Sequence, residues 1–168
     1  AVGGDTLQIE VNVMPGKGAI NLTGQMGDVM KESAQIALTY VRSISEQYDI
    51  AEDYFEKRDI HLHIPEGAVP KDGPSAGITM ATAILSAVTG RKVKASVAMT
   101  GEITLRGRVL PIGGLKEKLL AANMAGIKTV VVPEKNRKDV EELSEEITNG
   151  MKIVYASTMK DVLSTALC

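Results

Sequence analysis

Hydrophobic and polar residues alternate in the first part of the chain, with the period of a half-buried β-strand. The turn-forming run PGKG follows at residues 15–18, and the next residues, 19–23, predict a second strand. We therefore expect the two strands to pair as a β-hairpin. The apolar positions of the first strand are Leu7, Ile9, Val11 and Val13.

The period changes to that of a helix after residue 27. We expect this helix to begin at Asp28, which can cap it, and to end near Tyr48. Its predicted buried face consists of Val29, Ile36, Ala37, Tyr40, Ile44 and Tyr48.

Two further elements and a loop precede residue 91. Residues 59–64 alternate again and predict a strand, and residues 65–73 are expected to form a loop. Residues 76–89 predict an apolar helix that Gly90 ends.

The second half of the chain combines hairpin and helix signals. Residues 97–111 predict a hairpin with its turn at Gly101 or Gly107, and residues 115–125 predict a helix that Gly126 ends. Hairpins early and alternation late indicate an α+β or mixed α/β fold in one domain over residues 1–168. We expect the α+β form, with β-hairpins and a mixed sheet packed by helices. The last expected elements are strand 129–132, helix 137–143, strand 152–155 and helix 159–167.

Composition places the chain among globular proteins and weakens several classes of function. Of its 168 residues, 44% are hydrophobic and 24% charged, which is enough for the core of one domain. The net charge of −2 gives no support for nucleic acid as a partner. Cys168, the single cysteine, cannot form an internal disulfide. No signal-peptide pattern or membrane-spanning apolar stretch is visible, so we expect a cytoplasmic protein.

The most unusual stretch is DGPSAG at residues 72–77, where small residues flank Ser75 between a loop and an apolar helix. A serine in this place is exposed near the free N–H groups of a helix start, which suit a developing oxyanion. The alternative is structural, because serine is also a preferred helix N-cap. Position alone leaves both interpretations open.

Histidine-based mechanisms fit Ser75 poorly. Residues 73–77 match the G-x-S-x-G elbow of α/β-hydrolases, but that mechanism needs a histidine after the serine, and His61 and His63 both precede it. A triad of His61 or His63 with Asp72 and Ser75 survives as a formal alternative, although the two histidines share one strand face. As metal ligands they lack a third partner at a recognisable spacing, so we expect ordinary strand residues and no metal site.

Without a histidine, Ser75 needs another base, and lysine is the known variant. A lysine amine accepts a proton only when burial or nearby positive charge lowers its pKa, so the candidate should lie on an apolar helix face. Lys118 meets this requirement, whereas Lys116 points nearly the opposite way. The alternative is that the Lys118 stem covers apolar surface while its amine stays in water. Lys118 shares its helix face with Leu115, Ala121, Ala122 and Ala125.

Cofactor motifs are missing from the sequence. Gly16 and Lys17 are followed by Gly18 rather than by serine or threonine, so they do not form a phosphate-binding loop. No G-x-G-x-x-G opens a helix. We expect no cofactor in this domain.

Three long motifs resemble those of the Lon proteases of type A. They are PKDGPSAG at residues 70–77, MTGEITLRG at residues 99–107 and GGLKEKLL at residues 113–120. The separation between Ser75 and Lys118 also matches the dyad of that family. Shorter matches are PGKG at residues 15–18, EKRDIH at residues 56–61 and GIKTV at residues 126–130.

The resemblance implies a serine endopeptidase with Ser75 as nucleophile and Lys118 as base. It also implies that Thr100 orients the lysine amine, that Asp72 gates the site by pairing with Lys118, and that backbone N–H groups around Ser75 form the oxyanion hole. By the same resemblance, the fold is the α+β fold of the Lon proteolytic domain, the substrates are polypeptides and the subunits form a homohexameric ring.

Lon proteases of this type carry an ATPase module and an N-terminal substrate-binding region ahead of the proteolytic domain. The resemblance starts at residue 1, so we interpret the chain as a fragment whose missing ATPase module would use ATP and magnesium; the alternative is a natural stand-alone relative. The competing interpretation is a non-catalytic Lon-like domain that serves assembly or binding. The presence of both Ser75 and Lys118 argues against it.

Overall fold

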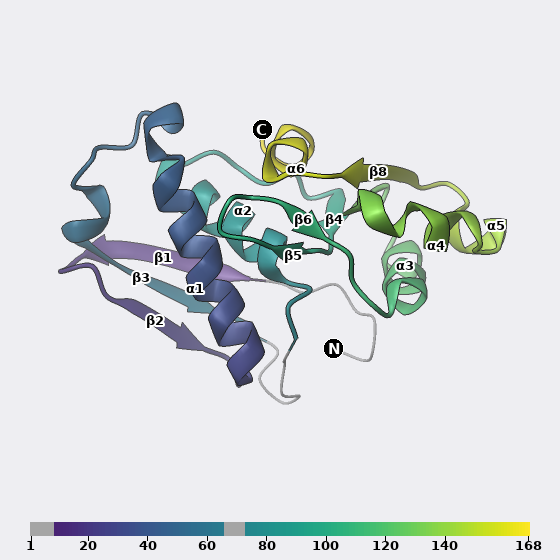
Figure 1. The fold of residues 1–168 in the computed structure, drawn as a ribbon, viewed down its shortest axis with the longest axis horizontal. Coiled ribbons are helices and arrows are strands. Elements are labelled where there is room, and N and C mark those ends of the chain that lie inside the picture. The colour runs from purple at the N-terminus through teal and green to yellow at the C-terminus, as the bar shows by residue number, and fades with distance from the viewer. Residues whose placement is uncertain (1–8, 66–72) are drawn as a thin grey trace.

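The computed structural model describes residues 9–65 and 73–168 (Figure 1). Strands and helices are interspersed along this part of the chain, which confirms the predicted mixture of sheets and helices in one fold. The strands are β1 (Glu10–Pro15), β2 (Ile20–Thr23), β3 (Arg58–His63), β4 (Val97–Met99), β5 (Glu102–Ile103), β6 (Val109–Leu110), β7 (Thr129–Pro133) and β8 (Lys152–Ala156). The helices are α1 (Asp28–Ser43), α2 (Gly77–Thr89), α3 (Leu115–Met124), α4 (Arg137–Glu141), α5 (Glu145–Thr148) and α6 (Met159–Ala166), and the 3-10 turns are η1 (Ser45–Tyr48), η2 (Tyr54–Glu56) and η3 (Glu134–Asn136).

The first sheet has the order β1-β3-β2, so the predicted hairpin between the first two strands is wrong. Strand β3 lies between them, antiparallel to β1 and parallel to β2. Its apolar residues explain this position, because Ile60 and Leu62 are almost completely buried while β1 and β2 bury theirs only in part. The strand with the most to bury takes the centre of the sheet.

The turn at residues 15–18 folds around Asp59 instead of closing a hairpin. The Asp59 carboxylate accepts the backbone N–H groups of Lys17 and Ala19, each at 2.9 Å. These hydrogen bonds lower the pKa of Asp59 below its usual value. A side chain on Gly16 would collide with this carboxylate, so the glycine permits the close approach.

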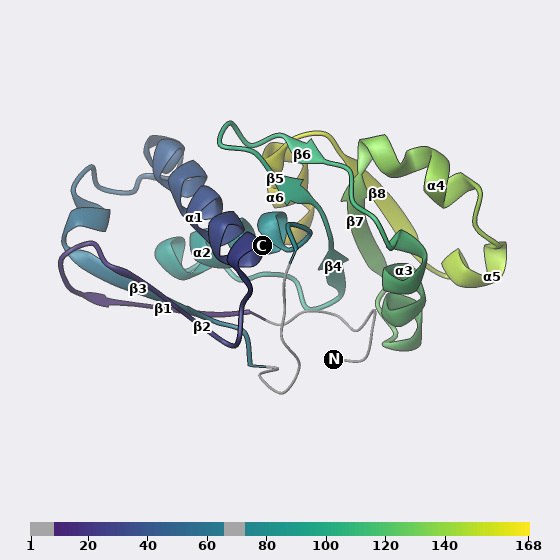
Figure 2. The same ribbon diagram turned by 60° about the horizontal axis from the view of Figure 1, so that its bottom comes forward.

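Helices α1 and α2 pack together on one face of this sheet (Figure 2). Helix α1 starts from Gly27, so the predicted cap at Asp28 is wrong: Asp28 is the first helical residue and makes no side-chain cap. Val29, expected in the core, is 45% exposed, because the buried stripe runs through Met30 instead. The helix ends at Ser43, and a 3-10 turn carries the chain on to Tyr48. The buried residues of α1 are Met30, Ser33, Ala34, Ala37, Tyr40 and Val41.

The second sheet is parallel, with the order β4-β7-β8, and it separates two hydrophobic clusters. Val131 of β7 faces the main core, which includes α1, α2 and α6. Val130 and Val132 face the opposite way, into a smaller core built with α3 and α4. Successive strand residues point to opposite faces, so the valine run fits a strand that is covered on both sides.

A short hairpin, β5–β6, lies over the main core. Its turn contains Gly107, one of the two predicted positions, where a Cβ would come within 2.3 Å of the Tyr40 ring. The hairpin does not begin at residue 97 as expected, because Val97–Met99 form β4 of the parallel sheet. Gly101 therefore lies in the connection between β4 of the parallel sheet and β5 of the hairpin.

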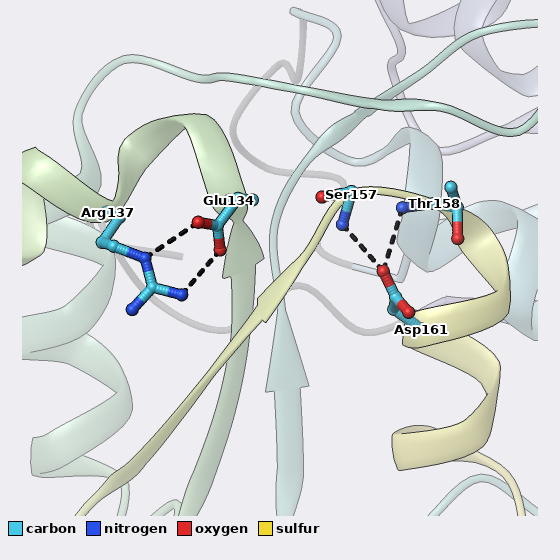
Figure 3. A network of polar contacts seen from close by, with 5 residues as sticks. All are labelled: Glu134, Arg137, Ser157, Thr158 and Asp161. Carbon is cyan, nitrogen blue, oxygen red and sulfur yellow. Dashed lines mark hydrogen bonds and ion pairs between the residues drawn. The ribbon is translucent and has the colours of Figure 1, made fainter.

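Polar contacts fix the chain where β7 and β8 end (Figure 3). After β7, Arg137 donates two hydrogen bonds to the carboxylate of Glu134, at 2.9 and 2.8 Å. After β8, Asp161 accepts the backbone N–H groups of Ser157 and Thr158 and completes a capping box at the start of α6. Helix α5 was not predicted; the expected helix 137–143 stops at Glu141. In the described part of the chain, no helix has the length and apolarity that a membrane crossing requires.

Candidate active site

Ser75 lies in the turn that leads into α2. The N-cap of α2 is Ala76 and no side chain caps the helix, so the interpretation of Ser75 as the helix cap is wrong. The serine side chain is half-buried, and the residue after it is buried in the main core. Its place just before the helix leaves the hydroxyl available for chemistry.

The segment between β4 and β5 holds the Ser75 peptide in place. The Gly101 N–H donates to the Ser75 carbonyl oxygen at 2.9 Å, and the Gly101 carbonyl accepts the N–H of Ile78 at 3.2 Å. A Cβ on Gly101 would come within 2.8 Å of Val109 and 3.1 Å of Ile78. The sequence alone did not indicate this role of Gly101, although a glycine within a signature motif is a signal for a close approach of two backbone segments.

Lys118 reaches Ser75 from the other side of the parallel sheet. Its Nζ donates to Ser75 Oγ at 2.8 Å, across 43 positions of sequence. The lysine extends from α3, which is anchored in the smaller core through Leu115, Leu119 and Ala122. Lys116 is exposed, as the helical geometry predicts. Ser75 and Lys118 thus extend from segments that are packed in different hydrophobic cores.

Burial lowers the pKa of Lys118 below that of a free lysine. The cause is desolvation, since removing water around an ammonium group disfavours its charged form. The alternative that its amine stays in water is therefore not what the structure shows. A half-buried amine with a lowered pKa in contact with a hydroxyl is suited to remove a proton from it.

Two backbone amides next to the hydroxyl are available to a ligand. Within the described residues, the N–H groups of Ser75 and Ala76 have no hydrogen-bond partner, whereas that of Gly77 donates to the Pro74 carbonyl at 3.2 Å. Adjacent free N–H groups beside a nucleophile can stabilise an oxyanion.

Thr100 and Asp72 are the two residues for which the sequence predicted supporting roles. Thr100 is buried beside Ser75, and its hydroxyl donates to the Ser75 carbonyl oxygen at 3.4 Å. This hydrogen bond does not involve the Lys118 amine, so the predicted role of Thr100 in orienting that amine stays a prediction. Asp72 lies outside the described residues, and so does its predicted gating role.

The two histidines take no part in this arrangement. His61 Nε2 and His63 Nδ1 both contact the hydroxyl of Thr23, on β2. Ser75 has Lys118 as its hydroxyl partner instead, which leaves the histidine-based triad without support. In residues 9–65 and 73–168, no three His, Cys, Asp or Glu side chains are arranged to hold a metal ion.

Known proteins match this chain over nearly its whole length. A family model described as the Lon protease (S16) C-terminal proteolytic domain matches residues 1–168. The Lon protease of Lachnoclostridium phytofermentans is 72% identical over 167 residues, 99% of this chain and 21% of that protein. Lon protease 1 of Bacillus subtilis is 61% identical over 166 residues, again 99% of this chain and 21% of the relative. The chain spans about a fifth of the length of these relatives, and it belongs to the Lon protease (S16) C-terminal proteolytic domain family.

Proposed function

We propose that this domain is a serine endopeptidase in which Ser75 is the nucleophile and Lys118 is its base. The contact of 2.8 Å between Lys118 Nζ and Ser75 Oγ is the observation that carries the proposal. Family membership supports peptide-bond hydrolysis, and the lowered pKa of Lys118 supports its role as the base.

The proposed reaction proceeds through an acyl-enzyme. Neutral Lys118 takes the hydroxyl proton as Ser75 Oγ attacks the substrate carbonyl carbon. The N–H groups of Ser75 and Ala76 stabilise the oxyanion, and Lys118 then gives its proton to the leaving amine as the peptide bond breaks. In the second half, neutral Lys118 removes a proton from water, the resulting hydroxide attacks the ester, and Ser75 recovers its proton.

We also propose a setting for this reaction, from family membership and the short share of the relatives that the chain spans. The whole protein is a cytoplasmic, ATP-dependent protease of type A that degrades misfolded and regulatory polypeptides. Another module uses ATP and magnesium, and this domain carries no cofactor of its own. Its subunits form a homohexameric ring, and nucleic acid is not its ligand. Thr100 orients Lys118, and Asp72 gates the site.

The Ser75→Ala variant tests the proposed nucleophile. We expect peptide cleavage to fall by about 10⁴-fold or more, because the acyl-enzyme cannot form. The circular dichroism spectrum should stay unchanged, since α2 does not use this side chain as its cap. Both measurements are made on one preparation. Equal activity in the two proteins would reject Ser75, and a folded wild-type chain without any activity would support the non-catalytic alternative.

A further inference from the structure

Helices α1 and α2 cover one face of the β1-β3-β2 sheet (Figure 2). Polar residues on the opposite face line a depression. Its volume is about 370 Å³, and its lining comes from all three strands: Glu10 and Asn12 on β1, Thr23 on β2, and His61 and His63 on β3. The proteolytic reaction proposed above uses none of these residues.

The two histidine rings converge on one point in this depression. Thr23 Oγ1 lies 2.9 Å from His61 Nε2 and 2.6 Å from His63 Nδ1. The histidines are two positions apart on one strand, so they share a face, and their ring centroids are 6.5 Å apart. The hydroxyl has one proton and can donate it to one of the two nitrogens at a time.

The strand order brings a carboxylate to the same place. Glu10 is directly opposite His63 in the antiparallel register of β1 and β3, and Thr23 is beside His63 on β2. The predicted hairpin between the first two strands would not have placed β1 and β2 on both sides of β3. This explains why the histidines alone, seen in the sequence, gave no indication of a site.

We propose that His61 and His63 chelate a divalent transition-metal ion of the zinc, nickel and copper group. Imidazole nitrogen is a preferred ligand of these ions, whereas magnesium and calcium prefer oxygen. The Thr23 hydroxyl rotates aside or remains as a neighbour, and the Glu10 carboxylate adds negative charge. No preformed set of three His, Cys, Asp or Glu ligands exists in the described residues, so water completes the coordination and the ion is exchangeable.

Isothermal titration calorimetry with Zn²⁺ tests the site on the Cys168→Ser chain, because Cys168 is an exposed free thiol that would bind the same ion. We expect one zinc ion per chain. His61→Ala and His63→Ala should each weaken the affinity by about 100-fold, since each removes one arm of a two-point chelate. Asn21→Ala, an exposed change on the same sheet, is the matched control and should leave the affinity unchanged.

Electron paramagnetic resonance of the Cu²⁺ complex separates chelation from a purely structural histidine pair. We expect coupling to two imidazole nitrogens in the parent chain and to one in each histidine variant. Circular dichroism establishes that the variants are folded. The proposal is overturned if zinc binding is absent, if either histidine variant binds zinc as tightly as the parent chain does, or if the copper spectrum of the parent chain shows a single nitrogen. Equal affinity for Mg²⁺ would also overturn it, because the ligands would then be oxygen atoms.

Discussion

At the residue scale, the chemistry depends on which form of Lys118 predominates. The protonated amine donates to Ser75 Oγ, but a base has to be neutral so that it can accept the hydroxyl proton. Burial shifts the balance toward the neutral form by lowering the pKa. Ser75 is not activated by its position alone. Its hydroxyl has to give up a proton, and the group that accepts this proton has to be neutral at the working pH.

The pH profile of peptide cleavage should follow this deprotonation. Below the pKa of Lys118 the amine is protonated and activity is low; as the pH rises through that pKa, activity increases to an alkaline plateau. Because the pKa is lowered, the midpoint should lie below about 10.4, the value of a free lysine. The measurement is kcat between mildly acid and alkaline pH with chemistry rate-limiting. A flat profile would contradict the role of Lys118 as the base.

The pair itself could be predicted from the sequence, because the residues make Lys118 a candidate base and the resemblance to Lon proteases implies its pairing with Ser75. Both histidines precede Ser75, and Lys118 is the lysine on the apolar side of its helix. The hydrogen bond of Thr100 to the Ser75 carbonyl could not be predicted. It depends on how one strand end approaches a turn 25 positions earlier, and no periodicity encodes that approach.

At the scale of elements, hydrophobic periods predicted the type of most segments but not which strands pair. The alternation in β1 and β2 correctly indicates half-buried strands. The alternation does not indicate that β3, which begins more than 30 positions after β2, lies between β1 and β2 in the sheet. Burial decides the strand order, and the buried area of a strand depends on packing partners that are distant in the sequence.

The Gly101→Ala variant tests the element that aligns the serine. The new methyl group would press on Val109 and Ile78, at 2.8 and 3.1 Å, in a segment that also binds the Ser75 peptide. Overpacking of this kind costs about 1–3 kcal/mol of unfolding free energy. We expect kcat to fall as well, because the Ser75 carbonyl moves with Gly101.

Gly113→Ala is the matched control, since a Cβ there meets no atom within 4 Å and the residue lies just before the helix that carries Lys118. Chemical denaturation and peptidase assays are applied to both variants. If the two glycine variants behaved alike, the close packing at Gly101 would have no part in positioning Ser75.

At the scale of the whole molecule, the contact between Ser75 and Lys118 joins two hydrophobic cores. Ser75 is positioned by the main core and Lys118 by the smaller one, with the β4-β7-β8 sheet between them. The contact of 2.8 Å therefore depends on the relative placement of both cores. The sequence predicted the two helices but not this division, because the alternation of Val130, Val131 and Val132 between the cores follows from a sheet that is covered on both faces.

Assays of the 168-residue chain by itself should show weak cleavage of short unstructured peptides without ATP. Peptides need only reach Ser75, whereas a folded substrate first has to be unfolded against roughly 5–15 kcal/mol. We expect no degradation of a folded protein. A fluorogenic peptide, an unfolded protein and a folded protein are each compared with and without ATP and magnesium. ATP-stimulated degradation of the folded protein by this chain would refute the prediction.

Labelling with a serine-reactive fluorophosphonate, followed by peptide mapping, tests the Ser75–Lys118 dyad most directly. We expect one adduct, on the peptide that contains Ser75. The adduct should be absent in Ser75→Ala and strongly slowed in Lys118→Arg, because arginine keeps its proton and cannot act as a base. It should form at the normal rate in Lys116→Arg, whose position is exposed. An adduct on another serine, or a normal labelling rate in Lys118→Arg, would contradict the dyad.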